Sequence, residues 1–565
     1  MNRLLKRQAA HRSIYWVMAL AAMLLVLAAC TPAAAPDGGG GDMADDSAAE
    51  ADSPAEDAGP AEQLLIGGFD VGPGGDPQGV LYNNGAGNTW FVKIFTPLIL
   101  MDETFSAHTS EGALAVEWSP NEDATIWTFN LREGVKWHDG EDFTASDLKW
   151  TAEFVSAPQA AVTHFGISQA DQIVGWTEYN SGEADEIAGI QAVDDLTLQI
   201  ELSISNPRFY DAVRGFYALP EHAIDFEPTE IFSADWWFSS PIGTGPFKFG
   251  AYEKDQFMEL VPNELYWDGA PKMEKLVNRY FVDETAAVLA LESGDIHFSY
   301  VSADVASRFE GNPDYQIFAG PSFVTNMFNY NYQNDAWKDK RVRQAIMYGT
   351  DRASIISDVF NGTAQATPCQ DPYPQFWPED ANYYEYDPEK ARSLLSEAAA
   401  DGVSLDGMNL DIPTYYTSQL AKDILTVIQA NLIDVGVDAN PTFLDVPTWR
   451  TVVDDNTAEW NIAYRGAGGG PVSYSPTWYV EGNQWGIDDP AYVDLFAAMD
   501  AAQTPEEYTA ARTALCAYQN EEATFGYWWV STRYGIASAD VADFHYFPAP
   551  GGGPVVDRSH LWNIE

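Results

Sequence analysis

The sequence predicts an α/β protein with mixed sheets. Strand-like alternation and helix-like periodicity follow one another from Glu62 to the end of the chain, and turn residues separate the segments. A chain of 565 residues is also longer than a single hydrophobic core normally stabilises, so more than one core is expected.

The first half of the chain combines short strands with one well-capped helix. Residues 126–131 alternate apolar and polar side chains, as a half-buried strand does, and residues 135–140 resemble a strand that ends in an Asp-Gly turn. Thr144 and Asp147 supply capping groups for a helix that runs through Val155.

Helices and strands alternate in the second half. Between Ser418 and Val435 the apolar residues recur every three or four positions, which predicts an amphipathic helix, and a strand over residues 437–444 should follow it. The other predicted segments are strands or extended chain at 196–202, 323–331 and 460–464, and helices at 285–293, 339–348, 352–360 and from Pro388 onward.

The first thirty residues have the layout of an export signal. Four Lys and Arg residues precede an apolar stretch at 14–27, which is short for a membrane span. Leu27-Ala28-Ala29-Cys30 resembles the lipobox of bacterial lipoproteins. This resemblance implies that residues 1–29 are removed as a signal peptide and that lipid on Cys30 holds the protein at a membrane surface outside the cytoplasm. An ordinary signal peptide or an uncleaved anchor is the alternative.

Residues 30–62 are expected to form a disordered acidic linker behind the lipidated Cys30. Positions 31–62 contain nine acidic residues, no Lys or Arg, and many Ala, Pro, Gly and Ser residues. Such a segment cannot bury enough apolar surface to fold, and its like charges keep it extended.

The charge of the chain excludes one class of partner. The net charge is −55, and it becomes −59 in a mature chain of 536 residues, because residues 1–29 carry four basic and no acidic side chains. Nucleic-acid binding requires a basic surface and is therefore excluded. The acidity keeps the protein soluble and favours a monomer.

Cys369 and Cys516 are the cysteines that follow Cys30. Two cysteines in an exported protein are more often paired than free, which favours a disulfide, although two buried thiols remain the alternative. No cysteine pair has the spacing of a metal site, and we expect neither a metal nor a cofactor.

Six segments of this chain carry a family resemblance: Leu114–Asp147, Gly243–Phe247, Ala290–Ile296, Arg341–Ala345, Asp351–Arg352 and Asp387–Ala391. They resemble, in the same order, segments of the solute-binding proteins of ABC importers, in the class that includes dipeptide and oligopeptide receptors. The resemblance covers nearly all of residues 63–565.

Most of these motifs fit structural roles. We expect Trp118, Trp127 and Trp137 to pack a β-rich lobe, and we interpret His138-Asp139 as part of a turn in preference to an acid/base pair. Gly243-Thr-Gly-Pro lacks the following Lys of a phosphate loop and fits a backbone turn.

The resemblance implies a two-lobed periplasmic-binding-protein-like fold with mixed sheets, hinge strands and an extra domain inserted in the first lobe. Ligand then lies between the lobes, and binding shifts an existing open–closed equilibrium. The implied divisions are lobe I at 63–105, 226–331 and 527–565, an inserted β-rich subdomain at 106–225, lobe II at 332–526, and hinges near Asn326–Asn331 and Gly526–Tyr534.

The ligand pocket is less clearly predicted. Peptide receptors of this class commonly carry an aspartate after the strand that corresponds to 460–464, but here no acidic residue occurs between Arg465 and Glu481. Because a buried ammonium needs a paired charge, an oligosaccharide is slightly preferred over a peptide. The candidate ligand-binding residues, whose aromatic members fit core packing equally well, are Asn88, Trp90, Asn331, Arg465, Tyr474, Trp478, Trp528 and Trp529.

The expected function is capture of an oligosaccharide or oligopeptide at the cell surface or periplasmic face and delivery to the transmembrane subunits of an ABC permease. Two alternatives remain open. One is an exported carbohydrate-active enzyme whose two carboxylates lie among the 84 acidic residues. The other is a sensor subunit that presents its ligand to a membrane partner. No nucleophile elbow or zinc motif occurs, so no catalytic residue is predicted.

Overall fold

A computed structural model gives the structure of the chain in two units, Met1–Ala58 and Gly59–Glu565, and every residue that it describes belongs to the second unit. The predicted signal segment, Cys30 and the acidic linker lie outside the described residues. Within the described ranges, no helix is both long and apolar enough to cross a bilayer. These ranges are 63–66, 92–102, 108–158, 160, 167–231, 233–254, 256–281, 283–405, 409–454, 460–468, 479, 483, 485–502, 504–546, 556 and 558–565.

The largest element is an eleven-stranded mixed sheet. Strand β14 is parallel to β15 and β16, and β1 is parallel to β10 and β11, whereas the other neighbours are antiparallel. In spatial order the strands are β15 (Asp438–Phe443), β14 (Asn409–Thr414), β16 (Ile462–Gly468), β12 (Tyr315–Tyr330), β17 (Gly526–Ser538), β11 (Phe298–Val301), β1 (Gln63–Ile66), β10 (Leu276–Arg279), β9 (Phe257–Pro262) and β8 (Phe247–Glu253), with β13 (Gln365–Ala366) paired to β17.

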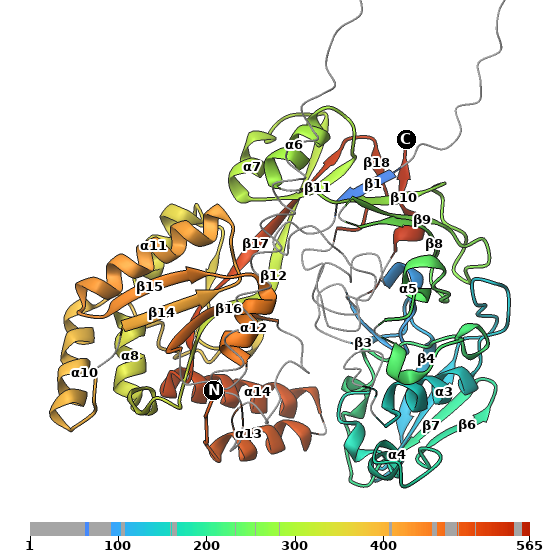
Figure 1. Cartoon of the computed structure of the whole chain (residues 1–565), viewed down its shortest axis with the longest axis horizontal. Helices are drawn as coiled ribbons and strands as arrows, with labels where there is room; N and C mark the ends of the chain where they lie inside the picture. Colours follow the sequence, from blue (N-terminus) through green and yellow to red (C-terminus); the bar gives the residue numbers. More distant parts are fainter. Residues whose placement is uncertain are drawn as a thin grey trace, which may run out of the picture. The chain divides into compact units, whose positions relative to one another are not determined.

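Strands β12 and β17 lie side by side and connect the two ends of this sheet (Figure 1). One end of β17 pairs with β11, through residues 534–537. The carboxyl-terminal part of β12 pairs with β16, through residues 324–330. The two longest strands therefore carry the chain between the parallel β14–β16 group and the β1–β11 group.

Helices pack against the β14–β16 group around a large core that extends from Met327 to Trp529. The amphipathic pattern after Ser418 forms α11, whose buried residues recur every three or four positions, and the Ser418 hydroxyl accepts the Ala421 N–H at 3.2 Å. The helices of this region are α8 (Lys340–Tyr348), α9 (Arg352–Ser354), α10 (Pro388–Ala400), α11 (Gln419–Asp434), α12 (Val446–Asp454), α13 (Ala491–Asp500) and α14 (Pro505–Glu522).

A separate four-stranded antiparallel sheet forms what we call the β-sheet subdomain. Its core extends from Leu98 to Ala218 and includes Trp127 and Trp137, and Trp118 packs against it, as predicted. Helix α3 (Ala145–Ser156) begins with a capping box between Thr144 and Asp147. The strands are β4 (Ala115–Pro120), β5 (Ile126–Leu131), β7 (Thr197–Glu201) and β6 (Ile190–Asp194).

A third core joins the edge of the large sheet to the chain end, and it combines Ile94, Phe298 and Trp562, which are far apart in sequence. A smaller cluster lies under two short helices. The elements of this region are β2 (Leu100–Met101), β3 (His108–Thr109), α5 (Trp236–Ser239), α6 (Glu284–Glu292), α7 (Ala303–Arg308), β18 (Val541–Ala542) and β19 (Asn563–Ile564).

The segment from Val135 to Gly140, predicted as a strand, forms a turn with one β-bridge between Lys136 and Asp142. The reason is a tertiary contact of His138. Its Nδ1 accepts the Gly243 N–H at 3.2 Å, and its Nε2 lies 3.1 Å from the Gly245 carbonyl oxygen. Burial lowers the pKa of His138 to about 4, so the neutral ring donates from Nε2.

The Gly243-Thr-Gly-Pro turn is a close backbone crossing. A Cβ atom on Gly243 would lie 2.0 Å from the Ile94 carbonyl oxygen, and one on Gly245 would lie 2.4 Å from that of Lys93. The two glycines therefore allow neighbouring chain segments to touch, which agrees with the predicted structural role.

Candidate functional site

A bulge in β12 lies at the centre of the candidate site. The pairing of β12 with β17 shifts between Pro321 and Thr325, and Phe323 has a φ of 53°. This left-handed conformation is unfavourable for a bulky residue and is often found at functional positions. The Phe323 ring stacks on Tyr373, with 5.4 Å between the ring centroids.

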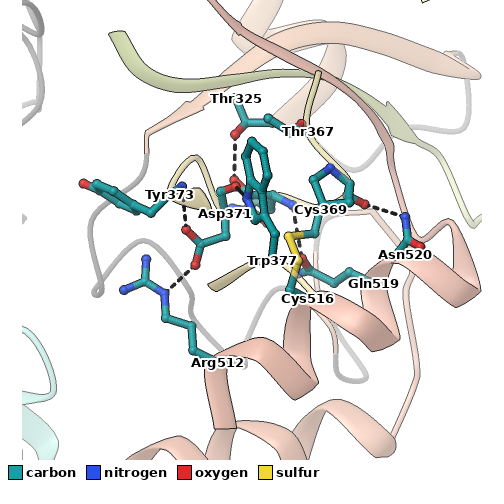
Figure 2. Close-up of a disulfide and its surroundings, with 12 residues drawn as sticks. Thr325, Thr367, Cys369, Asp371, Tyr373, Trp377, Arg512, Cys516, Gln519 and Asn520 are labelled. Atoms are coloured by element: carbon teal, nitrogen blue, oxygen red, sulfur yellow. Dashed lines mark hydrogen bonds and ion pairs between the residues drawn. A yellow bond between two sulfur atoms is a disulfide. The ribbon is translucent and has the colours of Figure 1, made fainter. Parts of the chain in front are cut away.

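Tyr373 belongs to a segment that a disulfide fixes against α14 (Figure 2). Cys369 and Cys516, the pair expected from the sequence, are joined with their Cα atoms 5.3 Å apart. The carbonyl oxygen of Gln370 accepts the Thr325 hydroxyl of β12 at 2.8 Å. Because covalent and hydrogen bonds hold it from two sides, this segment presents its side chains in fixed positions.

Asp371 and Arg512 form a buried ion pair beside the disulfide (Figure 2). Both side chains are only 3% exposed. Asp371 also accepts the Tyr373 N–H at 3.0 Å, and the Arg512 guanidinium lies 3.9 Å from the Phe376 ring centroid. A pair that is enclosed and hydrogen-bonded in this way tolerates the loss of neither partner.

A second group of charges belongs to the β-sheet subdomain. Arg208 and His108 both pair with Asp211, the His108 Nε2 at 3.0 Å. Burial alone would raise the pKa of Asp211, but the hydrogen bond from His108 and the charge of Arg208 outweigh it and lower that pKa. The Arg208 guanidinium also lies over the ring of Tyr508 in α14.

Arg465 lies within β16, one residue after Tyr464, which pairs with Thr414 at the carboxyl end of the parallel strand β14. Its guanidinium carbon is 5.8 Å from the ring centroids of both Trp449 and Trp485. Tyr415, which follows β14, accepts the Gly466 N–H at 3.3 Å. Ligands in open α/β sheets commonly bind outside such strand ends, and aromatic rings around a cation suit a polar ligand.

The other predicted ligand-binding residues fall into two groups. Asn88, Trp90, Tyr474 and Trp478 lie outside the described residues. Asn331, Trp528 and Trp529 are buried.

The buried three are engaged in packing and hydrogen bonding. Asn331 donates to the Trp460 carbonyl oxygen at 2.8 Å, and Phe328 meets Trp528 edge-on within the large core. Ligand contact by these three residues stays a prediction.

The sequence contains signals for these charged groups. Asp371 lies two residues after Cys369, and Arg512 lies one helical turn before Cys516. Arg214 interrupts the apolar run from Ala212 to Phe216 in a chain that has 29 basic and 84 acidic residues. A cation in such a run is unusual enough to mark a site.

Comparison with known proteins settles the family. Residues 109–486 match the model described as bacterial extracellular solute-binding proteins, family 5 Middle. The chain belongs to this family. Membership confirms the family predicted from the sequence motifs, which is a family of substrate-binding proteins.

Alignments of this family 5 protein with its relatives extend over most of its length. It is 34% identical over 534 residues to a protein of Brucella melitensis named as an ABC transporter peptide-binding protein, covering 92% of this chain and 97% of that one. It is 27% identical over 380 residues to the dipeptide-binding protein of Escherichia coli, covering 65% and 69% of the two chains.

A solved structure shows the same fold. The oligopeptide-binding protein AppA of Bacillus subtilis, in complex with a nonapeptide, superposes with a TM-score of 0.72 at 19% identity, covering 90% of this chain and all of that one. The two-lobed α/β fold class predicted for this family 5 protein is thereby confirmed.

Proposed function

We propose that this family 5 protein is the extracytoplasmic receptor of an ABC importer and that its ligand is a peptide. The observation that carries the proposal is the 34% identity, along 92% of the chain, to a protein named as an ABC transporter peptide-binding protein. The preference for a sugar rested on the missing aspartate after Arg465, and the relatives described above give it no support.

The proposed mechanism is closure of two lobes about β12 and β17, with the lobe boundaries given above. Both strands pass from the β11 side of the sheet to the β16 side, so a change in their twist moves one set of strands relative to the other. A peptide that contacts both lobes stabilises the closed state, and the permease then accepts the closed receptor.

The ligand contacts are proposed to include Arg465 and its aromatic neighbours, together with the predicted residues Asn88, Trp90, Tyr474 and Trp478. A guanidinium near two indole rings can hydrogen-bond a peptide carbonyl or carboxylate while the rings pack on aliphatic side chains. Ring and guanidinium together suit a peptide as well as a sugar.

A lipid on Cys30 is proposed to keep the receptor beside its permease. The support is the Leu-Ala-Ala-Cys motif after a basic and apolar segment. Radiolabelled palmitate supplied to the bacterial host should be incorporated into the wild type and not into Cys30→Ser. Equal labelling of the two proteins would contradict lipidation at this residue.

Ligand identification tests the proposal directly. The full chain, extracted in detergent, is denatured, and any released ligand is identified by mass spectrometry. Titration with di- to pentapeptides and with oligosaccharides then follows tryptophan fluorescence and melting temperature. We expect saturable peptide binding, a raised melting temperature and recovery of unchanged peptide. Binding of oligosaccharides alone refutes the peptide ligand, and turnover of either compound refutes the receptor.

A further inference from the structure

Arg214 is a buried cation with an unsatisfied hydrogen-bond donor. The residue is 9% exposed, its Nη1 atom is enclosed, and no hydrogen bond reaches that atom. The fully buried Val213 and Phe216 fix the surrounding backbone in the core of the β-sheet subdomain. Burial lowers the pKa of Arg214 and the charge of Asp211 opposes this, but a guanidinium remains charged at neutral pH.

Tyr373 supplies a second unsatisfied donor. It is 3% exposed, and its hydroxyl is buried without a hydrogen-bond partner. Phe323 stacks on its ring, and Met101 belongs to the same small core cluster. Burial raises the pKa of Tyr373, so the hydroxyl keeps its proton and acts as a donor at neutral pH.

The two groups lie in one buried neighbourhood. Met101, which shares a small core cluster with Tyr373, pairs with His108 in a short antiparallel sheet, and the His108 Nε2 lies 3.0 Å from Asp211, which precedes Arg214 by three residues. A phenol hydroxyl cannot neutralise a guanidinium, so a hydrogen bond between Arg214 and Tyr373 would bring no negative charge to Arg214.

The neighbouring charges are already engaged. Arg512 pairs with Asp371, and Arg208 pairs with Asp211. Asp102, whose charge also acts on Tyr373, has an interaction of its own. Among the described residues, Asp211 acts on the charge of Arg214 but is shared with Arg208, and the Arg214 Nη1 atom has no hydrogen-bond partner. A buried cation held in this way is costly unless a ligand supplies the anion.

We propose that Arg214 and Tyr373 form a binding site for a carboxylate of the peptide ligand. A carboxylate has two acceptor oxygens, so one can take an N–H of Arg214 and the other the O–H of Tyr373. The site would join the β-sheet subdomain to the segment after Cys369. This inference rests on the proposed peptide ligand, and the carboxylate comes either from the carboxyl terminus or from an Asp or Glu side chain.

Two matched peptide pools test the site. Random tetrapeptides are prepared as free acids and as carboxyl-terminal amides, and each pool is incubated with the full chain in detergent. Retained peptides are quantified by mass spectrometry. The variants are Arg214→Met, which keeps an aliphatic side chain, and Tyr373→Phe, which removes only the hydroxyl. The control is Arg308→Met, because Arg308 is an exposed arginine paired with Glu292 at the surface.

We expect the wild type and Arg308→Met to retain free acids at least about tenfold better than neutral amides, because a charge-assisted pair is lost in the amide. Arg214→Met should abolish this preference, and Tyr373→Phe should reduce it. Retention of amides that contain Asp or Glu, at the level of free acids, supports the site with a side-chain carboxylate as its ligand.

Equal retention of free acids and neutral amides by the wild type overturns the site, and so does a preference that survives in Arg214→Met. Retention of neither pool refutes the peptide receptor itself, which is a different result. Melting of the ligand-free variant separates binding from structure. A melting temperature of Arg214→Met at or above that of the wild type supports a ligand-directed charge, and a clear decrease would assign Arg214 a structural role and overturn the site.

Discussion

The guanidinium of Arg208 lies 3.4 Å from the centroid of the Tyr508 ring. Arg208 belongs to the β-sheet subdomain and Tyr508 to α14, so this contact joins parts of the chain that lie far apart in sequence. Asp211 holds the guanidinium in place through an ion pair. A cation stacked on a ring in a partly buried position stabilises the arrangement in which the two parts meet.

Loss of this contact should accelerate ligand release. Arg208→Met and Tyr508→Leu should each shorten the lifetime of the bound peptide, and the double variant should show a coupling energy of about 0.5–2 kcal/mol. Stopped-flow tryptophan fluorescence of all four proteins gives the dissociation rates. Strictly additive effects would show that the two side chains do not act together.

The disulfide should stabilise the large core. It connects residues 147 positions apart, so its reduction frees a long loop in the unfolded chain. We expect reduction to lower the free energy of unfolding by about 2–5 kcal/mol. Urea titrations with and without dithiothreitol measure this difference. The control is the double variant Cys369→Ser/Cys516→Ser, whose free energy of unfolding should not change with the reductant. Identical wild-type transitions in both conditions would contradict the expectation.

Removal of one member of the Asp371–Arg512 pair should be more damaging than removal of both. Asp371→Asn leaves the Arg512 cation buried and should destabilise the protein by about 3–5 kcal/mol. Asp371→Leu/Arg512→Met replaces both charges by apolar groups and should cost less. Circular dichroism in urea compares the variants. A double variant at least as unstable as the single one would argue against a desolvated charge as the cause.

Acid should weaken the turn that contains His138. The pKa of His138 falls from 6.5 to about 4 in the folded protein, so between these pH values the unfolded chain binds a proton that the folded chain excludes. Stability is therefore lost as the pH falls from 6.5 to 4, and this residue has no effect above that range. The difference in melting temperature between wild type and His138→Asn should shrink from pH 7.5 to pH 5.

The same comparison between pH 7.5 and pH 8.5 is the control, because the ring is neutral there in both states. A difference that stays constant down to pH 5 would mean that the folded protein accommodates the imidazolium ion.

Local pattern predicted the helices well, and tertiary contacts decided the exceptions. Helices α3, α10 and α11 carry caps and periodic apolar residues, and they begin where these signals stand. Residues 352–360, predicted as one helix, form α9 followed by a π-helix at Ile355–Val359. Here the Arg352 guanidinium is buried and donates to the Tyr527 carbonyl oxygen, a contact that no local pattern reveals.

The candidate site was predicted only in part for the same reason. The structure joins Cys369 and Cys516, the pair expected because cysteine pairing has few solutions, whereas ligand contact by Arg465 stays a prediction. Trp528 and Trp529 are of a residue type that often packs against ligands, but both side chains lie in the large core. The unsatisfied Nη1 atom of Arg214 depends on what folds around it, so the sequence alone shows only an arginine among apolar residues.

The order in which the ribosome makes the strands has a consequence for export. Strand β17, which separates β12 from β11 in the large sheet, is the last long strand to be synthesised. Until residue 538 has emerged, β12 and β11 each present an unpaired edge, and such edges recruit other chains. We therefore expect a chaperone to shield the newly made chain until its final residues arrive, and we expect a nonsense mutation before residue 526 to leave an aggregation-prone fragment.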